Sequence, residues 1–329
     1  MRVGLTYDMR GEYLAQGYKE EDVAEFDSEE TIAVIESTIR SLGYETERIG
    51  NISSLASKLA KGDRWDIVFN IAEGLSGRFR ESQVPSLLEI YNIGYTFSDP
   101  FVCALTLDKS FSKRVVRDCG IPTAKFKVVE DTRDIQQVSL EYPLFAKPMV
   151  EGTGKGIDGR SRVESPAQLA EVCEYLLERF NQPVLVEEYL PGREFTVAVL
   201  GNGLQAGVLG IMEIKIPGDS NCIYSYNAKE KCEKLVNYVP YRQGGSLHKQ
   251  LERLALKSYR ILQCRDAARV DFRCDAKGVP CFMEINPLPG LHPTHSDLPM
   301  IATQEAMSYP ELIDSIIKSA LSRLQPVKV

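Results

Sequence analysis

The chain has 329 residues, of which 43% are hydrophobic, and a formal net charge of −7. That length is sufficient for two or three domains of usual size, and no stretch is long and apolar enough to cross a bilayer. The negative charge argues against binding nucleic acid through a basic surface, so any bound phosphate must be held by local contacts.

The beginning of the chain, 1–8, is typical of a first strand and has neither the apolar core nor the cleavage site of a signal peptide. We therefore expect a cytoplasmic protein. The cysteines are scattered singly, without a C-x-x-C pair, and are interpreted as reduced, mostly buried thiols, with metal or redox use as the alternative. They are Cys103, Cys119, Cys173, Cys222, Cys232, Cys264, Cys274 and Cys281.

Strands and helices alternate over the first hundred residues. A capping box at 27–30 opens a helix whose apolar residues recur at helical spacing until Gly43. This βαβ pattern predicts a parallel sheet with helices on its faces. We expect an N-terminal domain over 1–106, with strands at 2–7, 45–49 and 65–70 and a further helix at 83–91.

Two further units are expected, a central one over 107–188 and a C-terminal one over 189–329. The first has predicted helices at 107–119 and 166–180, the latter entered through Ser165-Pro166, and strands at 142–147 and 184–188. The second has predicted strands at 195–200 and 204–211, a polar segment at 216–238, and helices at 247–262 and 309–324. The predicted fold class is α/β, in part α+β, with three units.

A β-hairpin is predicted near the end of the third unit. Two alternating runs, 268–274 and 281–286, flank the turn 275–278. If Asp275 pairs with Pro280 across a four-residue loop, the antiparallel register fixes which side chains face each other.

That register places Asp271 opposite Glu284 and Arg269 opposite Asn286, all on one face of the hairpin. Opposed carboxylates repel each other unless a cation lies between them, and magnesium prefers oxygen ligands of this kind. Asn286 can add a neutral oxygen, and Arg269 can contact a phosphoryl group or an oxyanion. The hairpin therefore predicts a magnesium site, with a solvated charged face as the alternative.

A glycine-rich loop, 149–156, follows the strand that ends at Lys147. Its small residues allow backbone N–H groups to point at phosphate oxygens, and Lys147 adds a point charge. It is not a Walker A loop, because Gly156 follows Lys155. A phosphate cradle and a flexible turn are both compatible with this segment.

A proline-rich loop, 287–296, follows the acidic face of the hairpin and is the kind of rigid loop that carries specificity. We interpret His292 and His295 as part of this loop's architecture, with a metal pair as the alternative. The acidic run 184–194, taken alone, is typical of a strand that ends in solvated glutamates.

Together, and in this order, these motifs resemble the ATP-grasp superfamily. They are Lys147-Pro148 with the glycine-rich loop, Glu187 to Leu190 followed by Glu194, and the trio Asp271, Glu284 and Asn286. Within that superfamily the chain is similar to D-alanine:D-alanine ligases, over nearly its whole length. The segments 107–110 and 194–200 strengthen the resemblance.

The resemblance implies a nucleotide site between the central and C-terminal units. Lys109 and Lys147 would contact the ATP phosphates, together with the loop at Thr153 and Gly154. The adenine would be held by the backbone of Glu187, Glu188, Tyr189 and Leu190, and the ribose by Glu194.

The resemblance also implies the catalytic and substrate groups. Asp271, Glu284 and Asn286 would hold two magnesium ions, with manganese as a substitute. Lys229 would steady the transferred phosphoryl group, Arg269 and the Gly290 N–H would stabilise the oxyanion, and Ser296 would bind the acceptor's carboxylate. Glu25 and Glu230 are the candidates near the first amino acid.

Several positions depart from the family pattern, mostly at the substrate end. Glu230 stands where a tyrosine is usual, and Glu188 replaces a lysine. Thr153 and Gly154 replace serines of the loop. An acidic insert at 18–27, which contains Glu25, replaces a short glycine loop, and the segment 69–74 replaces a histidine-glycine loop.

The function implied is that of an ATP-dependent ligase, which phosphorylates a carboxylate and lets an amine attack the acyl phosphate to give a dipeptide or an amide. Its partners would be small-molecule amino acid, carboxylate and amine substrates, without nucleic acid or membrane; a homodimer is left open. Two alternatives remain: an ATP-binding protein of this fold without ligase activity, and an ATP-grasp phosphotransferase.

Overall fold

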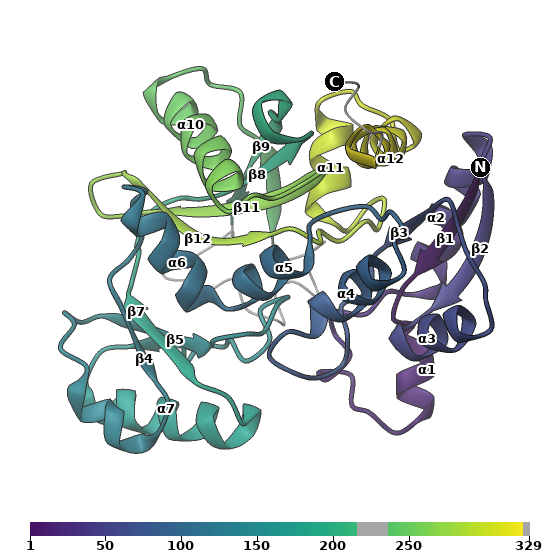
Figure 1. Ribbon diagram of the computed structural model, residues 1–329. Coiled ribbons are helices and arrows are strands. Elements are labelled where there is room, and N and C mark those ends of the chain that lie inside the picture. Colours follow the sequence, from purple (N-terminus) through teal and green to yellow (C-terminus); the bar gives the residue numbers. More distant parts are fainter. Residues whose placement is uncertain (216–235, 325–329) are drawn as a thin grey trace.

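The computed structural model describes residues 1–215 and 236–324 (Figure 1). Three sheets organise it, one parallel with three strands and two antiparallel with four and five strands. The predicted mixture of α/β and α+β structure is thereby confirmed.

The N-terminal sheet is ordered β2-β1-β3, with both pairs parallel. Ile32, Ile35 and Ile39 of the first long helix are fully buried in the core that this helix shares with the sheet. The βαβ prediction is confirmed. The elements of this unit are β1 (Arg2–Thr6), α1 (Arg10–Ala15), α2 (Glu29–Ser41), β2 (Glu45–Gly50), α3 (Ile52–Ala60), β3 (Ile67–Asn70), the 3-10 turn η1 (Arg80–Ser82) and α4 (Gln83–Ile90).

The start of α2 differs from the predicted capping box. Ser28 is the N-cap, and its hydroxyl accepts a hydrogen bond from the Thr31 N–H at 3.2 Å. The prediction of a reciprocal pair at 27–30 was wrong, because the residue three positions after Ser28 is a threonine without a carboxylate.

The second sheet, ordered β4-β7-β5-β6, is covered by one helix whose apolar face completes its core. Figure 1 shows this helix, α7, beneath the sheet and away from the rest of the molecule. The elements are α5 (Pro100–Leu107), α6 (Lys109–Asp118), β4 (Phe126–Val129), η2 (Thr132–Gln137), β5 (Leu144–Pro148), β6 (Arg162–Val163), α7 (Pro166–Phe180) and β7 (Val184–Glu188).

The predicted helix over 107–119 was wrong at its start. Asp108 has an extended backbone, with ψ of 97°, and separates α5 from α6. Its carboxylate accepts hydrogen bonds from the N–H groups of Ser110 and Phe111, at 3.1 and 3.2 Å. Asp108 is thus the N-cap of a new helix, and this places Lys109 in the first turn of that helix.

The third sheet, ordered β10-β9-β8-β11-β12, has helices on both faces. Phe195, Val197 and Val199 pack on the side of α10, whereas Ala198 and Met212 pack on the side of α11 and α12. The elements are β8 (Glu194–Leu200), η3 (Gly203–Gln205), β9 (Gly207–Lys215), β10 (Asn237–Pro240), α10 (Ser246–Ile261), β11 (Ala267–Cys274), β12 (Pro280–Asn286), α11 (Asp297–Gln304) and α12 (Tyr309–Leu324).

One prediction for this unit is corrected, and another falls mostly outside the described residues. The strand predicted at 204–211 starts only at Gly207, because the preceding residues form η3. Most of the polar segment predicted at 216–238 lies outside the described residues. No helix of the described part of the chain is long and apolar enough to span a membrane.

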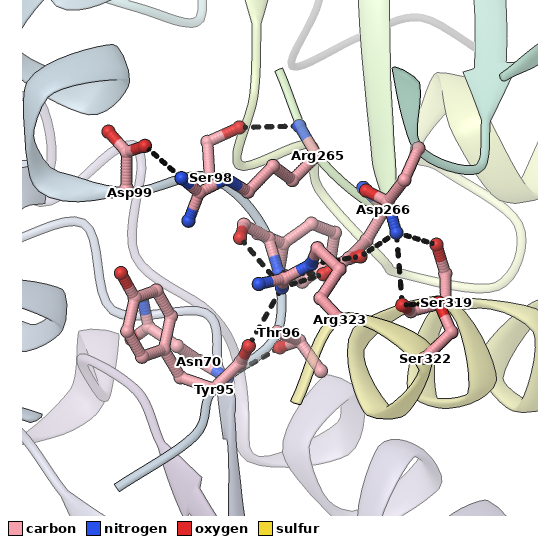
Figure 2. Close-up of polar contacts among 12 residues, drawn as sticks. Asn70, Tyr95, Thr96, Ser98, Asp99, Arg265, Asp266, Ser319, Ser322 and Arg323 are labelled. Carbon is pink, nitrogen blue, oxygen red and sulfur yellow. Dashed lines mark hydrogen bonds and ion pairs between the residues drawn. The ribbon is translucent and has the colours of Figure 1, made fainter. Parts of the chain in front are cut away.

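A buried polar network joins the N-terminal unit to the third sheet and to α12 (Figure 2). Arg323 donates to Asp266 at 2.6 Å and to the carbonyl oxygens of Tyr95 and Phe97 at 3.0 and 3.3 Å. The Asp266 carboxylate also accepts a hydrogen bond from the Phe97 N–H at 2.7 Å. Three segments distant in sequence are therefore held at one point.

Candidate active site

The hairpin β11–β12 places its polar residues in the predicted register. Arg269 lies opposite Asn286, and Asp271 lies opposite Glu284. Because side chains alternate along a strand, Val270 is fully buried whereas Arg269 and Asp271 lie on the more accessible face.

The pairing nearest the turn differs from the prediction. Cys274 pairs with Pro280, and the register shifts between Asp271 and Phe272, so that Met283 is an extra residue on β12. Asp275 instead organises the turn, because its carboxylate accepts hydrogen bonds from the Lys277 and Val279 N–H groups at 2.9 and 2.8 Å. The bulge restores the predicted register at the polar end of the hairpin.

Arg269 and Asp271 are held by several contacts. The Arg269 guanidinium lies 3.0 Å from Asp271 and donates to Asp297 at 2.8 Å, and the Thr196 hydroxyl donates to Asp271 at 2.6 Å. Burial raises the pKa of Asp271, the charge of Arg269 opposes that rise, and the charge of Glu284 adds to it.

The donors on this face fit a hard divalent cation. Asp271 and Glu284 supply two opposed carboxylates, and the Asn286 amide oxygen, which also accepts from the Leu288 N–H at 3.0 Å, supplies a neutral donor. Within residues 1–215 and 236–324, no three His, Cys, Asp or Glu side chains gather as a metal site. The set therefore fits an ion that takes its remaining ligands from a substrate's phosphate oxygens.

Two lysines point toward this face from the central unit. The Lys109 ammonium lies 3.5 Å from Glu284 and donates to the Glu151 carbonyl oxygen at 2.5 Å. The Lys147 ammonium lies 3.0 Å from Glu187. Lys109 and Lys147 are both buried, so their ammonium groups face the interior of the protein and not bulk solvent.

Glu187 joins Lys147 to a second buried lysine, Lys113, which lies 2.8 Å from its other carboxylate oxygen. Burial alone would raise the pKa of Glu187, but the two ammonium groups lower it to about 2. Burial lowers the pKa of Lys113. The side chain of Glu187 thus fixes the position of Lys147.

The glycine-rich loop follows directly. Thr153, Gly154 and Gly156 have φ values of 50°, 75° and 74°, and a Cβ on Gly156 would lie 2.5 Å from Pro148 Cγ. The Thr153 hydroxyl is buried and finds no hydrogen-bond partner among the described residues. The Gly152 N–H donates to Glu25, whose carboxylate also pairs with Arg80 at 2.8 Å.

Two adjoining cavities bring most of the predicted site residues together. The larger, of about 290 Å³, is lined by Glu25, Thr153, Asn286, Gly290 and Ser296 among others. The smaller, of about 70 Å³, is lined by Lys147, Gly154, Glu194 and Asp271. Lys109, Arg269 and Glu284 line both.

The segment from Glu187 to Leu190 lines neither cavity. Glu188 pairs with Lys125 at 3.1 Å. The Tyr189 N–H donates to the Pro143 carbonyl oxygen at 3.0 Å, and the Tyr189 hydroxyl accepts from Arg273 at 3.2 Å. Arg273 also lies 3.3 Å from Glu194, so this arginine connects the segment to the smaller cavity.

Gly290 and Ser296 lie close together in the proline-rich loop. A Cβ on Gly290 would lie 2.7 Å from the Ser296 hydroxyl oxygen, which accepts a hydrogen bond from the His292 N–H at 3.0 Å. The rings of His292 and His295 have centroids 4.5 Å apart. Of the remaining predicted residues, Lys229, Glu230, Cys222 and Cys232 lie outside the described residues; the other six cysteines are free thiols.

Comparison with known proteins gives a consistent result. The model of the D-ala D-ala ligase C-terminus family matches residues 115–318. The D-alanine–D-alanine ligase of Bordetella avium is 35% identical over 254 residues, which are 76% of this chain and 78% of that protein. The chain belongs to the D-alanine–D-alanine ligase family.

Other relatives and solved structures agree with this family membership. The Aquifex aeolicus D-alanine–D-alanine ligase is 32% identical over 286 residues, covering 86% of this chain and 92% of that protein. The crystal structure of the Bacillus anthracis D-alanine–D-alanine ligase complexed with ATP has the same fold, with a TM-score of 0.75 at 22% identity, and covers 98% of each chain.

Membership in this family makes the protein an ATP-dependent ligase that forms C–N bonds, and it implies the use of ATP and a divalent metal ion. The ATP-grasp resemblance inferred from the sequence is confirmed.

Sequence reasoning missed several charged residues of the larger cavity. Glu73 and Glu81 line it, and Arg80 lies beside them through its contact with Glu25. The segment 69–74 was noted only as a departure from the family pattern. The one available signal was the presence of two arginines and two glutamates between residues 73 and 81, next to a segment that departs from the family pattern.

Proposed function

We propose that the protein transfers the γ-phosphoryl group of ATP to a substrate carboxylate and joins the resulting acyl phosphate to an amine. In the first step a P–O bond to the carboxylate forms while the P–O bond to ADP breaks. In the second step the amine nitrogen attacks the carbonyl carbon, and inorganic phosphate and a proton leave. The proposal is carried by the convergence of Lys109, Arg269 and Glu284 on both adjoining cavities.

ATP is proposed to bind between the units 107–188 and 189–329, with its phosphates in the smaller cavity. Lys109 and Lys147 would neutralise phosphate charge from one side, and the glycine-rich loop at Thr153 and Gly154 would offer backbone N–H groups. The Thr153 hydroxyl, which has no described partner, is available to a ligand oxygen.

The rest of the nucleotide is assigned from the resemblance. The adenine would lie against the backbone between Glu187 and Leu190, and Glu194, which lines the smaller cavity, would bind the ribose. Arg273 supports this assignment, because it contacts both Tyr189 and Glu194.

Asp271, Glu284 and Asn286 would hold magnesium, as one ion or two. When bound, the metal neutralises the charge on the β- and γ-phosphates during transfer. The contribution of the chain is to hold the two carboxylates in register. Lys229 is proposed to contact the transferred phosphoryl group.

Arg269 and the Gly290 N–H are proposed to stabilise the tetrahedral oxyanion of the second step, because both line the larger cavity. Asp297 and Asp271 hold the Arg269 guanidinium in place from two sides. Ser296 would bind the carboxylate of the acceptor, and Glu25 and Glu230 remain the candidates near the first substrate.

The test measures ADP release with ATP, magnesium and candidate amino acids, with hydroxylamine present to trap the acyl phosphate. D-alanine is the first candidate, because the relatives are named for it. We expect amine-dependent ADP release and a hydroxamate with at least one carboxylate. ADP release without a hydroxamate or coupled product for any candidate would contradict the proposal.

A further inference from the structure

Of the described residues that line the larger cavity, six have acidic side chains, whereas only Lys109 and Arg269 carry a permanent positive charge, and the buried Arg80 adds one more beside the lining Glu25. Most of these carboxylates have a partner within the protein. Glu151 pairs with Lys155 at 2.8 Å, Asp297 pairs with Arg269 at 2.8 Å, and Glu284 lies near Lys109 and belongs to the proposed metal site.

Glu25, the residue expected to bind the first substrate, is also satisfied. One of its carboxylate oxygens pairs with the Arg80 guanidinium at 2.8 Å, and the other accepts a hydrogen bond from the Gly152 N–H. Arg80 is itself buried and donates to the Val150 carbonyl oxygen at 2.9 Å, which fixes it beside Glu25. A substrate's positive charge would therefore have to compete with a built-in arginine at this position.

Glu73 and Glu81 are different. Neither carboxylate makes a hydrogen bond or an ion pair with any residue within 1–215 and 236–324. Glu81 is only 8% exposed, yet it lines the cavity. Burial raises the pKa of both carboxyls, and the charge of Glu25 adds to this rise, whereas the charge of Arg80 opposes it. A carboxylate as deeply buried as that of Glu81 is costly to keep charged without a directly bonded cation, and a ligand can supply that contact.

The net charge of the ligand decides between substrate classes. A zwitterionic amino acid brings one positive and one negative charge, so it leaves the acidic excess of the cavity unchanged. An amino acid with a cationic side chain brings a net positive charge that can be shared by the two glutamates.

We propose that Glu73 and Glu81 form a cation subsite that selects a basic amino acid, with a side-chain ammonium or guanidinium group, as a substrate of the ligase. The subsite rests on the proposed function, because it lies in the cavity assigned to the joined substrates. Its carboxylates come from two neighbouring segments, the one that follows β3 and the turn η1, so they can approach one cation from two directions.

The test is calorimetry of the whole protein with magnesium and a non-hydrolysable ATP analogue, titrated with both enantiomers of lysine and of norleucine. These two ligands differ in the side-chain charge. We expect one enantiomer of lysine to bind at least about tenfold more tightly than the matching norleucine, since a charge-assisted hydrogen bond is of that size.

The variants Glu73→Gln and Glu81→Gln should each bring the affinities for lysine and norleucine to within about twofold, without changing the affinity for the ATP analogue. The exposed Glu174→Gln, on α7, removes the same charge far from the cavity and should leave the preference intact. The thermal midpoint reports folding, because a merely structural role of Glu73 or Glu81 would lower it in the variants.

Equal affinities for lysine and norleucine, no binding of lysine, or a preference that survives in both variants would each overturn the subsite. Failure of the proposed ligase function has a different signature, namely lysine binding without ADP release for any pair of substrates. The two inferences are therefore separable.

Discussion

The two adjoining cavities differ in how their charges are balanced. In the smaller one, which we assign to the nucleotide phosphates, the charged groups are held by the protein itself: Lys147 by Glu187, and Arg269 by Asp271 and Asp297. In the larger one, the carboxylates of Glu73 and Glu81 make no hydrogen bond or ion pair with any residue of 1–215 and 236–324, although the charge of Arg80 acts on both. A site for a ligand that is the same in every turnover can have its charged groups fixed by the protein. A site that selects among substrates can instead leave carboxylates unpaired, so that only a substrate with a matching positive charge compensates them.

The largest change in stability is expected at Glu187, whose buried carboxylate is paired with two buried lysines. Glu187→Gln removes the carboxylate between two buried lysines, Lys113 and Lys147, and leaves both charges without compensation. Breaking a buried ion pair in this way costs about 3–5 kcal/mol, and urea unfolding should show a loss of this size.

Its neighbour provides a matched control. Glu188 pairs with Lys125, whose side chain is 73% exposed, and exposed pairs contribute less than about 1 kcal/mol. Glu188→Gln should therefore leave the free energy of unfolding nearly unchanged. Similar losses in both variants would show that the buried contacts of Glu187 with Lys113 and Lys147 do not contribute more to stability than an exposed ion pair.

The second prediction concerns turnover. Asp271→Asn removes one of the two opposed carboxylates, and steady-state ADP formation should fall by about 10²–10³-fold, the usual scale for a lost electrostatic contact to a transition state. The fold should be retained, because burial already raises the pKa of Asp271 and disfavours its charge. A variant with full turnover would remove Asp271 from the proposed metal site.

Acid should lower the free energy of unfolding, because it protonates Glu187. Its pKa is about 2 in the folded state and about 4.3 in an unfolded chain. The folded state thus binds fewer protons, so this contribution of about 3 kcal/mol is complete above pH 4.3 and is lost as the pH falls toward 2. Urea unfolding between pH 6 and pH 3 should show this slope, and Glu187→Gln should flatten it.

The smallest effect is expected at the unbalanced cavity. Glu81→Gln should leave the free energy of unfolding at pH 8 unchanged or raise it by about 1 kcal/mol, because burial and Glu25 disfavour the charge that the variant removes. A clear loss of stability, comparable to that of Glu187→Gln, would erase the difference between the two cavities.

Sequence reasoning predicted the polar end of the hairpin β11–β12 and the helix α7 well. Alternation along residues 268–286 was enough to place Asp271 opposite Glu284, although the assumed pairing of Asp275 with Pro280 was wrong and the bulge at Met283 compensated for it. The boundaries of α7 were predicted in full, because Ser165 and Pro166 mark its start and polar and apolar residues alternate with helical period.

Other elements gave weak signals for physical reasons. The helix α5 is apolar along nearly its whole length and so has no polar face to reveal a helical period. The helix α11 is short and has Pro299 in its first turn, which is a weak sign of a helix. The ion pairs Arg80–Glu25 and Lys113–Glu187 join residues 55 and 74 positions apart in sequence. No local pattern specifies such pairs, because they depend on how the units pack.

The network around Asp266 has a consequence for the order in which the protein can be assembled during synthesis. Tyr95 precedes Arg323 by 228 residues, and Arg323 donates to its carbonyl oxygen (Figure 2). The N-terminal unit leaves the ribosome long before α12 is synthesised, so Asp266 and the carbonyl oxygens at 95 and 97 lack this cationic partner until Arg323 has been added to the chain. A ribosome-bound chain that ends before Arg323 would therefore leave these oxygens without their cation, and the N-terminal unit would complete its contact with the third sheet only after α12 has been made.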